Sequence, residues 1–160
     1  MKKAVIISDT HGKLESVKKL YPLFEENDFV FHLGDGAGDI REFYKEYPEK
    51  VYLCAGNCDF CSPYPTEGQV EIEGIKIFFT HGHNYRVKWH LYDLAERAKE
   101  LNCQIALYGH THRASIDKVG GITCINPGSL FFGVGKGGSY CYLVINKGEF
   151  TPVIVGENLQ

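Results

Sequence analysis

The chain has 160 residues, 44% of them apolar, and a formal net charge of −3 at pH 7. This length and composition fit one globular domain that buries most of its unfolded surface, and they argue against disorder. The small negative charge argues against long nucleic acid as a partner, and no apolar stretch approaches the roughly 20 residues of a membrane span.

The first half of the chain alternates between apolar strands and short helices. Runs of apolar and β-branched residues predict buried strands at 3–8, 29–33 and 51–55. Apolar residues at helical spacing predict a helix that begins near Leu14 and ends or kinks near Tyr21, because Pro22 follows. A second short helix is predicted at 39–47. This alternation favours parallel strands joined by right-handed crossovers.

The second half is richer in hairpins. Strands are predicted at 67–72 and 75–80, on either side of a Glu73-Gly74 turn. An apolar stripe at helical spacing predicts a helix over 87–101, and a strand follows at 105–108. Four further strands, at 115–119, 122–125, 140–145 and 150–155, resemble an antiparallel meander. We therefore expect one α/β domain, residues 1–160, with two sheets packed together and helices outside.

Six cysteines occur, and no secretory segment is recognisable at the start, where Met1-Lys2-Lys3 leads into a short apolar run. We therefore expect a soluble cytoplasmic protein with reduced thiols. Three cysteines with apolar neighbours are predicted core residues: Cys103, Cys124 and Cys141. Cys58-x-x-Cys61 resembles a zinc or redox motif but lacks a second such pair, so we favour this explanation least.

Seven side chains that can bind metals lie just after predicted strands. They are Asp9, His11, Asp35, Asn57, His81, His110 and His112. Each alone has an ordinary structural explanation, since an Asp often caps a helix and a His often only donates a hydrogen bond. Their joint occurrence at successive strand ends instead indicates transition-metal binding, and favours two ions over one.

The spacing of these residues suggests how they reach the ions. Asp9 and His11 are two residues apart, and in extended chain such side chains point the same way, so we expect both to reach one ion. The two oxygens of the Asp35 carboxylate can bridge two ions. Asn57 offers a neutral carbonyl oxygen.

A known family has the same residues in the same order. Asp9-x-His11, Gly34-Asp35, Gly56-Asn57, His81-Gly82 and Gly109-His110-x-His112 resemble the calcineurin-like metallophosphoesterase pattern, from residue 3 to about residue 129. The short chain and Asn126-Pro127-Gly128-Ser129 resemble the small prokaryotic phosphodiesterase branch of that family. The resemblance implies a four-layer α/β/β/α sandwich, with two mixed sheets packed face to face.

The resemblance also implies a ligand set and a reaction. One ion would be held by Asp9, His11, Asp35 and His112, and the other by Asp35, Asn57, His81 and His110. The expected metals are Mn²⁺ or Ni²⁺, with Fe²⁺, Co²⁺ or Zn²⁺ as alternatives. The expected reaction is hydrolysis of small phosphodiesters by in-line attack of a metal-bridging hydroxide, which makes Asp35, Asn57, His81 and His110 catalytic as well.

Three further residues are predicted near the substrate. Many family members have His after the Asn, close to the leaving group, whereas this chain has Cys58, a neutral and poorer proton donor. Asp59 is expected to support the loop. His83 is either at the rim of the pocket or an exposed loop histidine, whereas His32 and His90 are expected to be structural.

Alternative functions remain open from the sequence. The same ions could serve a phosphomonoesterase, and the retromer small subunit resembles this fold but acts as a non-catalytic scaffold. A small phosphodiester is the expected binding partner, with no membrane and no long nucleic acid. Leu130-Phe131-Phe132 is either a core edge or a patch for a homodimer.

Overall fold

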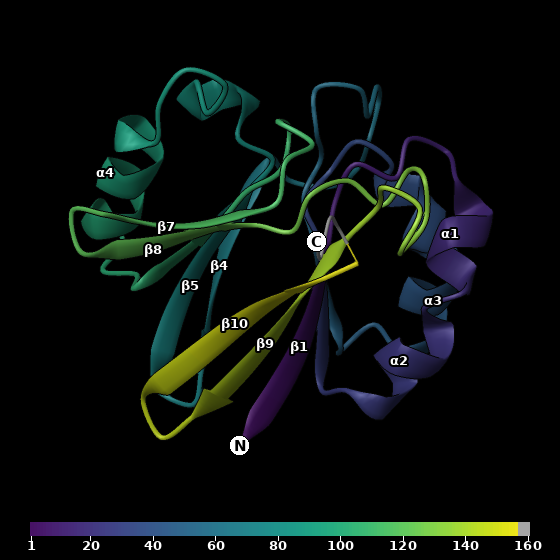
Figure 1. Ribbon diagram of the computed structural model, residues 1–160, viewed down its shortest axis with the longest axis horizontal. Helices are drawn as coiled ribbons and strands as arrows, with labels where there is room; N and C mark the ends of the chain where they lie inside the picture. Colours follow the sequence, from purple (N-terminus) through teal and green to yellow (C-terminus); the bar gives the residue numbers. More distant parts are fainter. Residues whose placement is uncertain (157–160) are drawn as a thin grey trace.

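Figure 1 shows the computed structural model, which describes residues 1–156. The described strands form two mixed five-stranded sheets, with orders β10-β9-β1-β2-β3 and β4-β5-β6-β8-β7. The first sheet contains β1 (Lys2–Ile7), β2 (Phe29–His32), β3 (Val51–Leu53), β9 (Tyr140–Asn146) and β10 (Glu149–Val155). The second sheet contains β4 (Glu67–Ile72), β5 (Ile75–Thr80), β6 (Ile105–Leu107), β7 (Ser115–Val119) and β8 (Ile122–Asn126).

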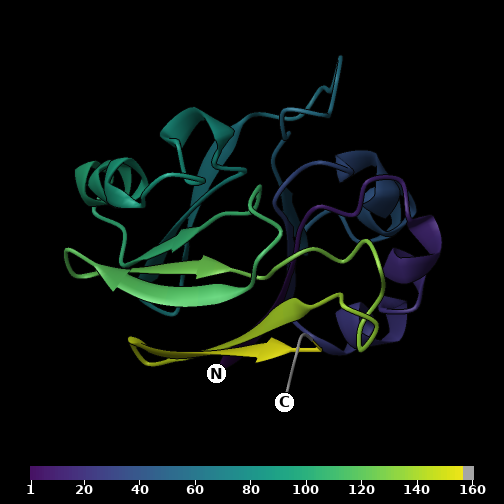
Figure 2. The ribbon, with the colours of Figure 1, turned by 45° about the horizontal axis from the view of Figure 1, so that its top comes forward.

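The sheets pack face to face and the helices cover their outer faces. Figure 2 shows the two groups of helices at opposite sides of the molecule, with the sheets between them. The first sheet is covered by α1 (Leu14–Lys18), α2 (Tyr21–Glu26), 3₁₀ helix η1 (Ala37–Ile40) and α3 (Arg41–Glu46). The second sheet is covered by 3₁₀ helix η2 (His83–Tyr85) and α4 (Tyr92–Glu100). The four-layer sandwich expected from the sequence is therefore confirmed.

Alternation along the strands produces these layers. Ile6 and Phe31 meet Ile77 and Leu107 in the core between the sheets, whereas Val5, next to Ile6, packs against the helices outside. Successive strand residues point to opposite faces, so a strand covered on both sides must be apolar throughout. Burying each such side chain contributes about 1.5–3 kcal/mol.

The direction of the strands positions the site. β1, β2 and β3 are parallel, and so are β5, β6 and β8. Carboxyl ends of parallel strands share one edge of a sheet, where loops gather ligand-binding groups. A hydrogen bond from Gly109 N–H to the His81 carbonyl, 2.9 Å, ties two of these loops together.

The meander predicted for the last four strands is wrong. β7 and β8 form a hairpin in the second sheet, whereas β9 and β10 form a hairpin in the first, where β9 pairs antiparallel with β1. Residues 127–139 cross between the sheets. Leu130 is fully buried in that crossing and its N–H donates to the Ser8 carbonyl, 3.1 Å, so tertiary packing overrides the local alternation.

Two predicted helices also differ. The helix expected over 87–101 begins only at Tyr92, because Arg86 adopts a left-handed φ of 55° and the Tyr92 N–H donates to His90 Nδ1, 3.2 Å. The first predicted helix is two helices. Pro22 does not simply end α1; it lies in the first turn of α2, where its missing N–H costs nothing.

Candidate metal centre

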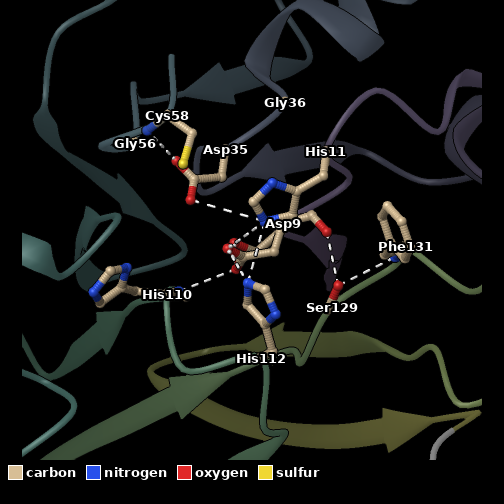
Figure 3. Close-up of polar contacts among 12 residues, drawn as sticks. Asp9, His11, Asp35, Gly36, Gly56, Cys58, His110, His112, Ser129 and Phe131 are labelled. Atoms are coloured by element: carbon tan, nitrogen blue, oxygen red, sulfur yellow. Dashed lines mark hydrogen bonds and ion pairs between the residues drawn. The ribbon is translucent and has the colours of Figure 1, made fainter. Parts of the chain in front are cut away.

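The seven predicted ligands come from loops at one end of the two sheets, and six of them lie in one cluster. Figure 3 shows Asp9 between His11 and His112, with Asp35 and His110 both to the left of Asp9 in this view. Three groups of side chains have ligand atoms within 4.8 Å of one another. They are Asp9, His11 and His112; His11, Asp35 and Cys58; and Asp35, His81 and His110.

Asp9 is at the centre of the cluster and is fully buried. Its Oδ2 atom accepts hydrogen bonds from the Ser8 hydroxyl, 2.6 Å, and from the His110 N–H, 3.0 Å. Its Oδ1 atom is buried and has no hydrogen-bond partner among the described residues. Nε2 atoms of His112 and His11 lie 3.2 and 3.6 Å from this oxygen. A buried carboxylate oxygen left without a donor is costly, and a cation would satisfy it.

Asp35 and His81 belong to a second group of donor atoms, together with His110. The Nδ1–H of His81 donates to the Leu33 carbonyl, 2.8 Å, which leaves the Nε2 lone pair free. That Nε2 lies 3.2 Å from Asp35 Oδ2 and 3.1 Å from Nδ1 of His110. The other oxygen of Asp35 accepts the Cys58 N–H, 2.8 Å. One Asp35 oxygen is therefore held by the chain while the other faces the histidines.

The electrostatics of the two carboxylates favour their charged form. Burial raises the pKa of Asp9, but contact with His112 and the nearby His81 outweigh it and the net pKa is lowered. Burial likewise opposes ionisation of Asp35, and His81 with the Cys58 N–H lowers its pKa well below the usual range. Both residues are therefore anionic at neutral pH and ready for a cation.

The histidines are shifted in different directions. The pKa of His81 is lowered by burial but raised more by Asp35 and Asp9, so the net pKa rises. Contact with Asp9 raises the pKa of His112. Burial and the positive charges of His81 and Lys88 lower the pKa of His110 to about 4. His110 is thus neutral and able to bind metal over a wide pH range, whereas protons compete for the other two.

The backbone carrying these side chains is strained. Positive φ occurs at Asp9 (55°), His11 (44°), Asp35 (56°), His110 (71°) and His112 (62°). Only a few per cent of non-glycine residues adopt it, at a cost of about 1–3 kcal/mol each. The premise of extended chain from Asp9 to His11 is therefore wrong. The two side chains still converge, because the chain turns and His11 N–H donates to the Asp35 carbonyl, 2.9 Å.

Two glycines let the strand ends approach closely. A Cβ on Gly109 would lie 2.1 Å from Ser8 Oγ and 2.6 Å from Asp9 Oδ2. A Cβ on Gly56 would lie 2.1 Å from Asp35 Oδ1. Both contacts are impossible, so these positions need glycine for the carboxylates to sit where they do.

Asn57 is the seventh predicted ligand and lies next to Cys58, which belongs to one of the three groups. Its side chain is exposed, and its Nδ2 donates weakly to Cys58 Sγ, 3.5 Å. Cys58 lies beside Asp35, which together with burial raises the pKa of its thiol, so the thiol is neutral. Cys61 is exposed and belongs to none of the three groups of ligand atoms found among the described residues. The structure therefore does not favour a Cys58-Cys61 metal site.

Asp59 connects the loops next to Asp35 through backbone hydrogen bonds. Its carboxylate accepts the backbone N–H groups of Asp35, Gly36 and Gly56 at 2.7–2.8 Å, and that of Ala37 at 3.2 Å. This one side chain fixes two loops that carry Asp35 and Asn57. His83 is half-buried, with its ring centroid 5.5 Å from that of His81, and its buried Nδ1 has no hydrogen-bond partner within residues 1–156. His83 thus lies beside the cluster, not on an exposed loop.

A buried hydrogen-bond network behind the ligands was not predicted. Gly34 N–H donates to His32 Nδ1, 3.1 Å, so the ring donates from Nε2 to Thr10 Oγ1, 3.0 Å. Thr10 in turn donates to Asp39 Oδ2, 2.5 Å. Burial lowers the pKa of His32 to about 4. The neutral ring fixes the loops on both sides of Asp9, which makes His32 structural, as expected.

One cavity adjoins the cluster, and a second is lined by residues next to His110 and His112 in the chain. One, of about 420 Å³, is lined by His11, His112, Ser129, Phe131, Phe132 and Gly137. The other, of about 500 Å³, is lined in part by Lys88, Thr111 and Arg113. Ser129 donates to the Asp9 carbonyl, 2.7 Å, and Asn126 donates to Thr111 Oγ1, 2.9 Å. The Asn126–Ser129 turn therefore also forms part of the pocket wall.

The sequence and the fold are both similar to known phosphoesterases. The profile of the calcineurin-like phosphoesterase superfamily domain matches residues 1–148. A probable metallophosphoesterase, YsnB of Bacillus subtilis, is 34% identical over 129 residues, which cover 79% of this chain and 73% of that protein. The phosphodiesterase YfcE of Escherichia coli K12 is 28% identical over 165 residues, covering 87% and 84%.

Solved structures of other proteins are also similar to this chain. The crystal structure of a predicted phosphoesterase from Streptococcus pneumoniae has a TM-score of 0.80 and 28% identity, covering 97% of this chain and 89% of that one. Vacuolar Protein Sorting 29 from Cryptosporidium parvum has a TM-score of 0.75 at 18% identity, covering 96% of each chain, and thus shares the fold. Among the described residues, no helix is both long and apolar enough to cross a membrane.

Proposed function

The chain belongs to the calcineurin-like phosphoesterase superfamily and is a metal-dependent phosphoester hydrolase, and we propose that it hydrolyses small phosphodiesters with two divalent metal ions. The observation that carries this proposal is the pair of donor groups on either side of Asp35. Asp9, His11 and His112 form one group, and Asp35, His81 and His110 form the other. Asp35 Oδ2 lies within 3.2 Å of His81 Nε2 and 3.9 Å of His11 Nε2, so one carboxylate reaches both groups.

The residues present fit divalent transition metals. Asp9 Oδ1 is a buried oxygen without a donor, and imidazole with carboxylate is the donor set of Mn²⁺, Fe²⁺, Co²⁺, Ni²⁺ or Zn²⁺ sites. We propose Mn²⁺ or Ni²⁺ as the working ions. Bound in this way, two ions would lower the pKa of a water and neutralise phosphate oxygens.

The protein's own part is to orient these groups and to attract the phosphate. The His81 ring is fixed by the Leu33 carbonyl, and Asp9 is fixed by Ser8 and His110. Asn57, whose side chain is exposed beside Cys58, is proposed as the additional ligand of the second group. Lys88 lies close enough to lower the pKa of His110 and His112, so its charge also acts on an incoming anion.

A diester is favoured over a monoester by the charge of the pocket. A monoester dianion carries one more negative charge than a diester and needs more positive compensation. The position beside the leaving group holds the neutral Cys58 thiol, whose pKa is raised further. A phosphomonoesterase therefore remains the weaker alternative.

A non-catalytic scaffold is the other alternative, because Vps29 structures share this fold. At 14–18% identity that likeness concerns the fold alone. The donor cluster is nearly complete, and five of its residues have a strained, left-handed backbone conformation. Such strain persists where the function of a site requires it, so both observations argue for catalytic activity.

The test measures metal content and activity on the same purified protein. The chelated protein, reloaded with Mn²⁺, Ni²⁺ or Mg²⁺, is assayed on bis(4-nitrophenyl) phosphate and on 4-nitrophenyl phosphate, which share one leaving group. We expect two ions per chain, activity restored better by Mn²⁺ or Ni²⁺ than by Mg²⁺, and higher kcat/KM for the diester. A metal-free protein with full activity would refute the proposal. A higher kcat/KM for the monoester would instead favour the phosphomonoesterase alternative.

A further inference from the structure

The cavity of about 420 Å³ beside the metal centre is aromatic and opens directly onto it. Two of its lining residues, His11 and His112, belong to the donor cluster, and their Nε2 atoms are 3.1 Å apart. Phe131 and Phe132 line it further from the cluster. Any group bound here is therefore in contact with residues that would hold one of the metal ions.

The aromatic wall is held in place. The Phe131 N–H donates to Ser129 Oγ, 3.2 Å, and Ser129 itself donates to the Asp9 carbonyl. The Phe131 ring meets His11 edge-to-face, at 6.3 Å between centroids and 74° between planes. In Figure 3, Phe131 and Ser129 lie on the same side of Asp9 as His11. The wall is thus built from the same hydrogen bonds that position the metal ligands.

Phe132 completes the wall and presents an unused ring face. It packs against Phe131 at 88° with centroids 4.9 Å apart, yet it is 66% exposed. A cation is close by, because Lys13 Nζ lies 4.7 Å from the centre of the Phe131 ring. An exposed aromatic side chain beside a buried polar site, with a cation near it, is suited to a flat ring attached to an anion.

We propose that this cavity is the subsite for a planar aromatic substituent of the substrate, such as a nucleobase or a phenyl ring attached to the phosphoester. The inference rests on the proposed phosphodiesterase function and narrows its substrate class. Stacking of such a ring on an aromatic side chain strengthens binding by about 10- to 100-fold. Phe132 is then a specificity residue and takes no part in the chemical step.

Binding of paired phosphorus ligands tests this without turnover. Calorimetric titration of the Mn²⁺-loaded protein compares phenylphosphonate with methylphosphonate, and thymidine 5′-phosphate with 2-deoxyribose 5-phosphate. We expect the aromatic member of at least one pair to bind about 10-fold more tightly or better. The pair with the larger preference identifies the ring as nucleobase or simple aryl.

Two variants locate the effect. Phe132→Ala should reduce the aromatic preference to within about threefold, with binding of the non-aromatic member unchanged. Phe60→Ala is the matched control, because Phe60 is 85% exposed but lines a different cavity; it should keep the full preference. Equal binding within both pairs in the parent, or an undiminished preference in Phe132→Ala, overturns the subsite. Absence of diester hydrolysis would refute the proposed function separately, because these titrations do not depend on turnover.

Discussion

The Nε2 atom of His112 lies 3.2 Å from Oδ1 of Asp9, a buried oxygen without a hydrogen-bond partner among the described residues. The two groups shift each other's pKa in opposite directions, upward for His112 and, together with His81, downward for Asp9. A protonated His112 therefore supplies the positive charge next to Asp9 that a bound metal ion would otherwise supply. Metal binding must displace this proton, which makes the site sensitive to pH.

Metal-induced stabilisation should increase from pH 6 to pH 8. The folded pKa values of His81 and His112 lie above 6.5, so their stabilising charge is fully present below 6.5 and is lost as pH rises through the raised values. The apoprotein loses this contribution at the pH where the rings become free for metal. We expect the gain in Tm on adding Mn²⁺ to be larger at pH 8, by scanning calorimetry at both values.

The control for this pH effect is His112→Asn, which removes one of the two competing protons. Its metal-induced gain in Tm should be smaller and should depend less on pH. A gain that is the same at pH 6 and pH 8 in the parent protein would contradict the account.

Replacing Asp35 should be more damaging than replacing Asn57. Asp35 faces both donor groups, whereas Asn57 offers one neutral oxygen. Loss of residues that only support a ligand reduces metal affinity about 10- to 100-fold, so Asp35→Asn should lower kcat/KM by more than about 100-fold and leave fewer than two ions bound. Asn57→Ala should retain at least one ion. Metal analysis and kinetics on both variants check this, and an Asp35→Asn protein with parental activity would rule out the bridging role.

Cys58 should make the rate depend strongly on the leaving group. A neutral thiol gives little help to a departing alkoxide, whereas aryl groups of low pKa depart unaided. Cys58→His should therefore raise the rate most for alkyl leaving groups and for monoesters, and Cys58→Ser should change little. The measurement is the slope of log kcat/KM against leaving-group pKa. Identical slopes in parent and Cys58→His, with an inactive Cys58→Ser, would assign the thiol a positive role instead.

Asp59 should be needed for stability as well as for the site. Asp59→Ala leaves four backbone N–H groups without their acceptor, and we expect a loss of about 2–3 kcal/mol in the free energy of unfolding. Urea unfolding of the metal-free protein measures it. The control is Asp117→Ala, an exposed carboxylate on β7, which should change stability by less than about 0.5 kcal/mol. If Asp59→Ala and Asp117→Ala lowered the free energy of unfolding equally, the proposed supporting role of Asp59 would be refuted.

Local sequence patterns predicted most of the fold. Apolar runs indicated the strands to within two residues at each end, and the Glu73-Gly74 turn joins β4 and β5 as expected. The cysteines predicted to lie in the core are buried at positions 103, 124 and 141. These features follow from side-chain alternation and turn chemistry, which act over a few residues. Helix boundaries were less accurate, since the helix expected over 87–101 begins only at Tyr92, whose N–H donates to His90 Nδ1.

The same local patterns identified which residues form the site but not how they meet. The Asp and His residues predicted as ligands after successive strands lie in one cluster, whereas their roles as metal ligands stay a prediction. Their left-handed backbone was not foreseen, since φ at Asp9 is imposed by the hydrogen bond from its N–H to the Gly34 carbonyl, 3.0 Å. The contact between Ser129 and the Asp9 carbonyl likewise joins residues far apart in the chain.

The sequence by itself determined the chemical identity of the donors, because residue type and spacing are local properties of the chain. Only the tertiary structure decided that β9 and β10 belong to the first sheet. This placement brings residues 127–139 across the end of β1. That crossing places Phe131 beside His11 and so creates the aromatic wall. Contacts of this kind depend on which distant strands pair, and the physical cause is burial of both faces of β1, which no local pattern specifies.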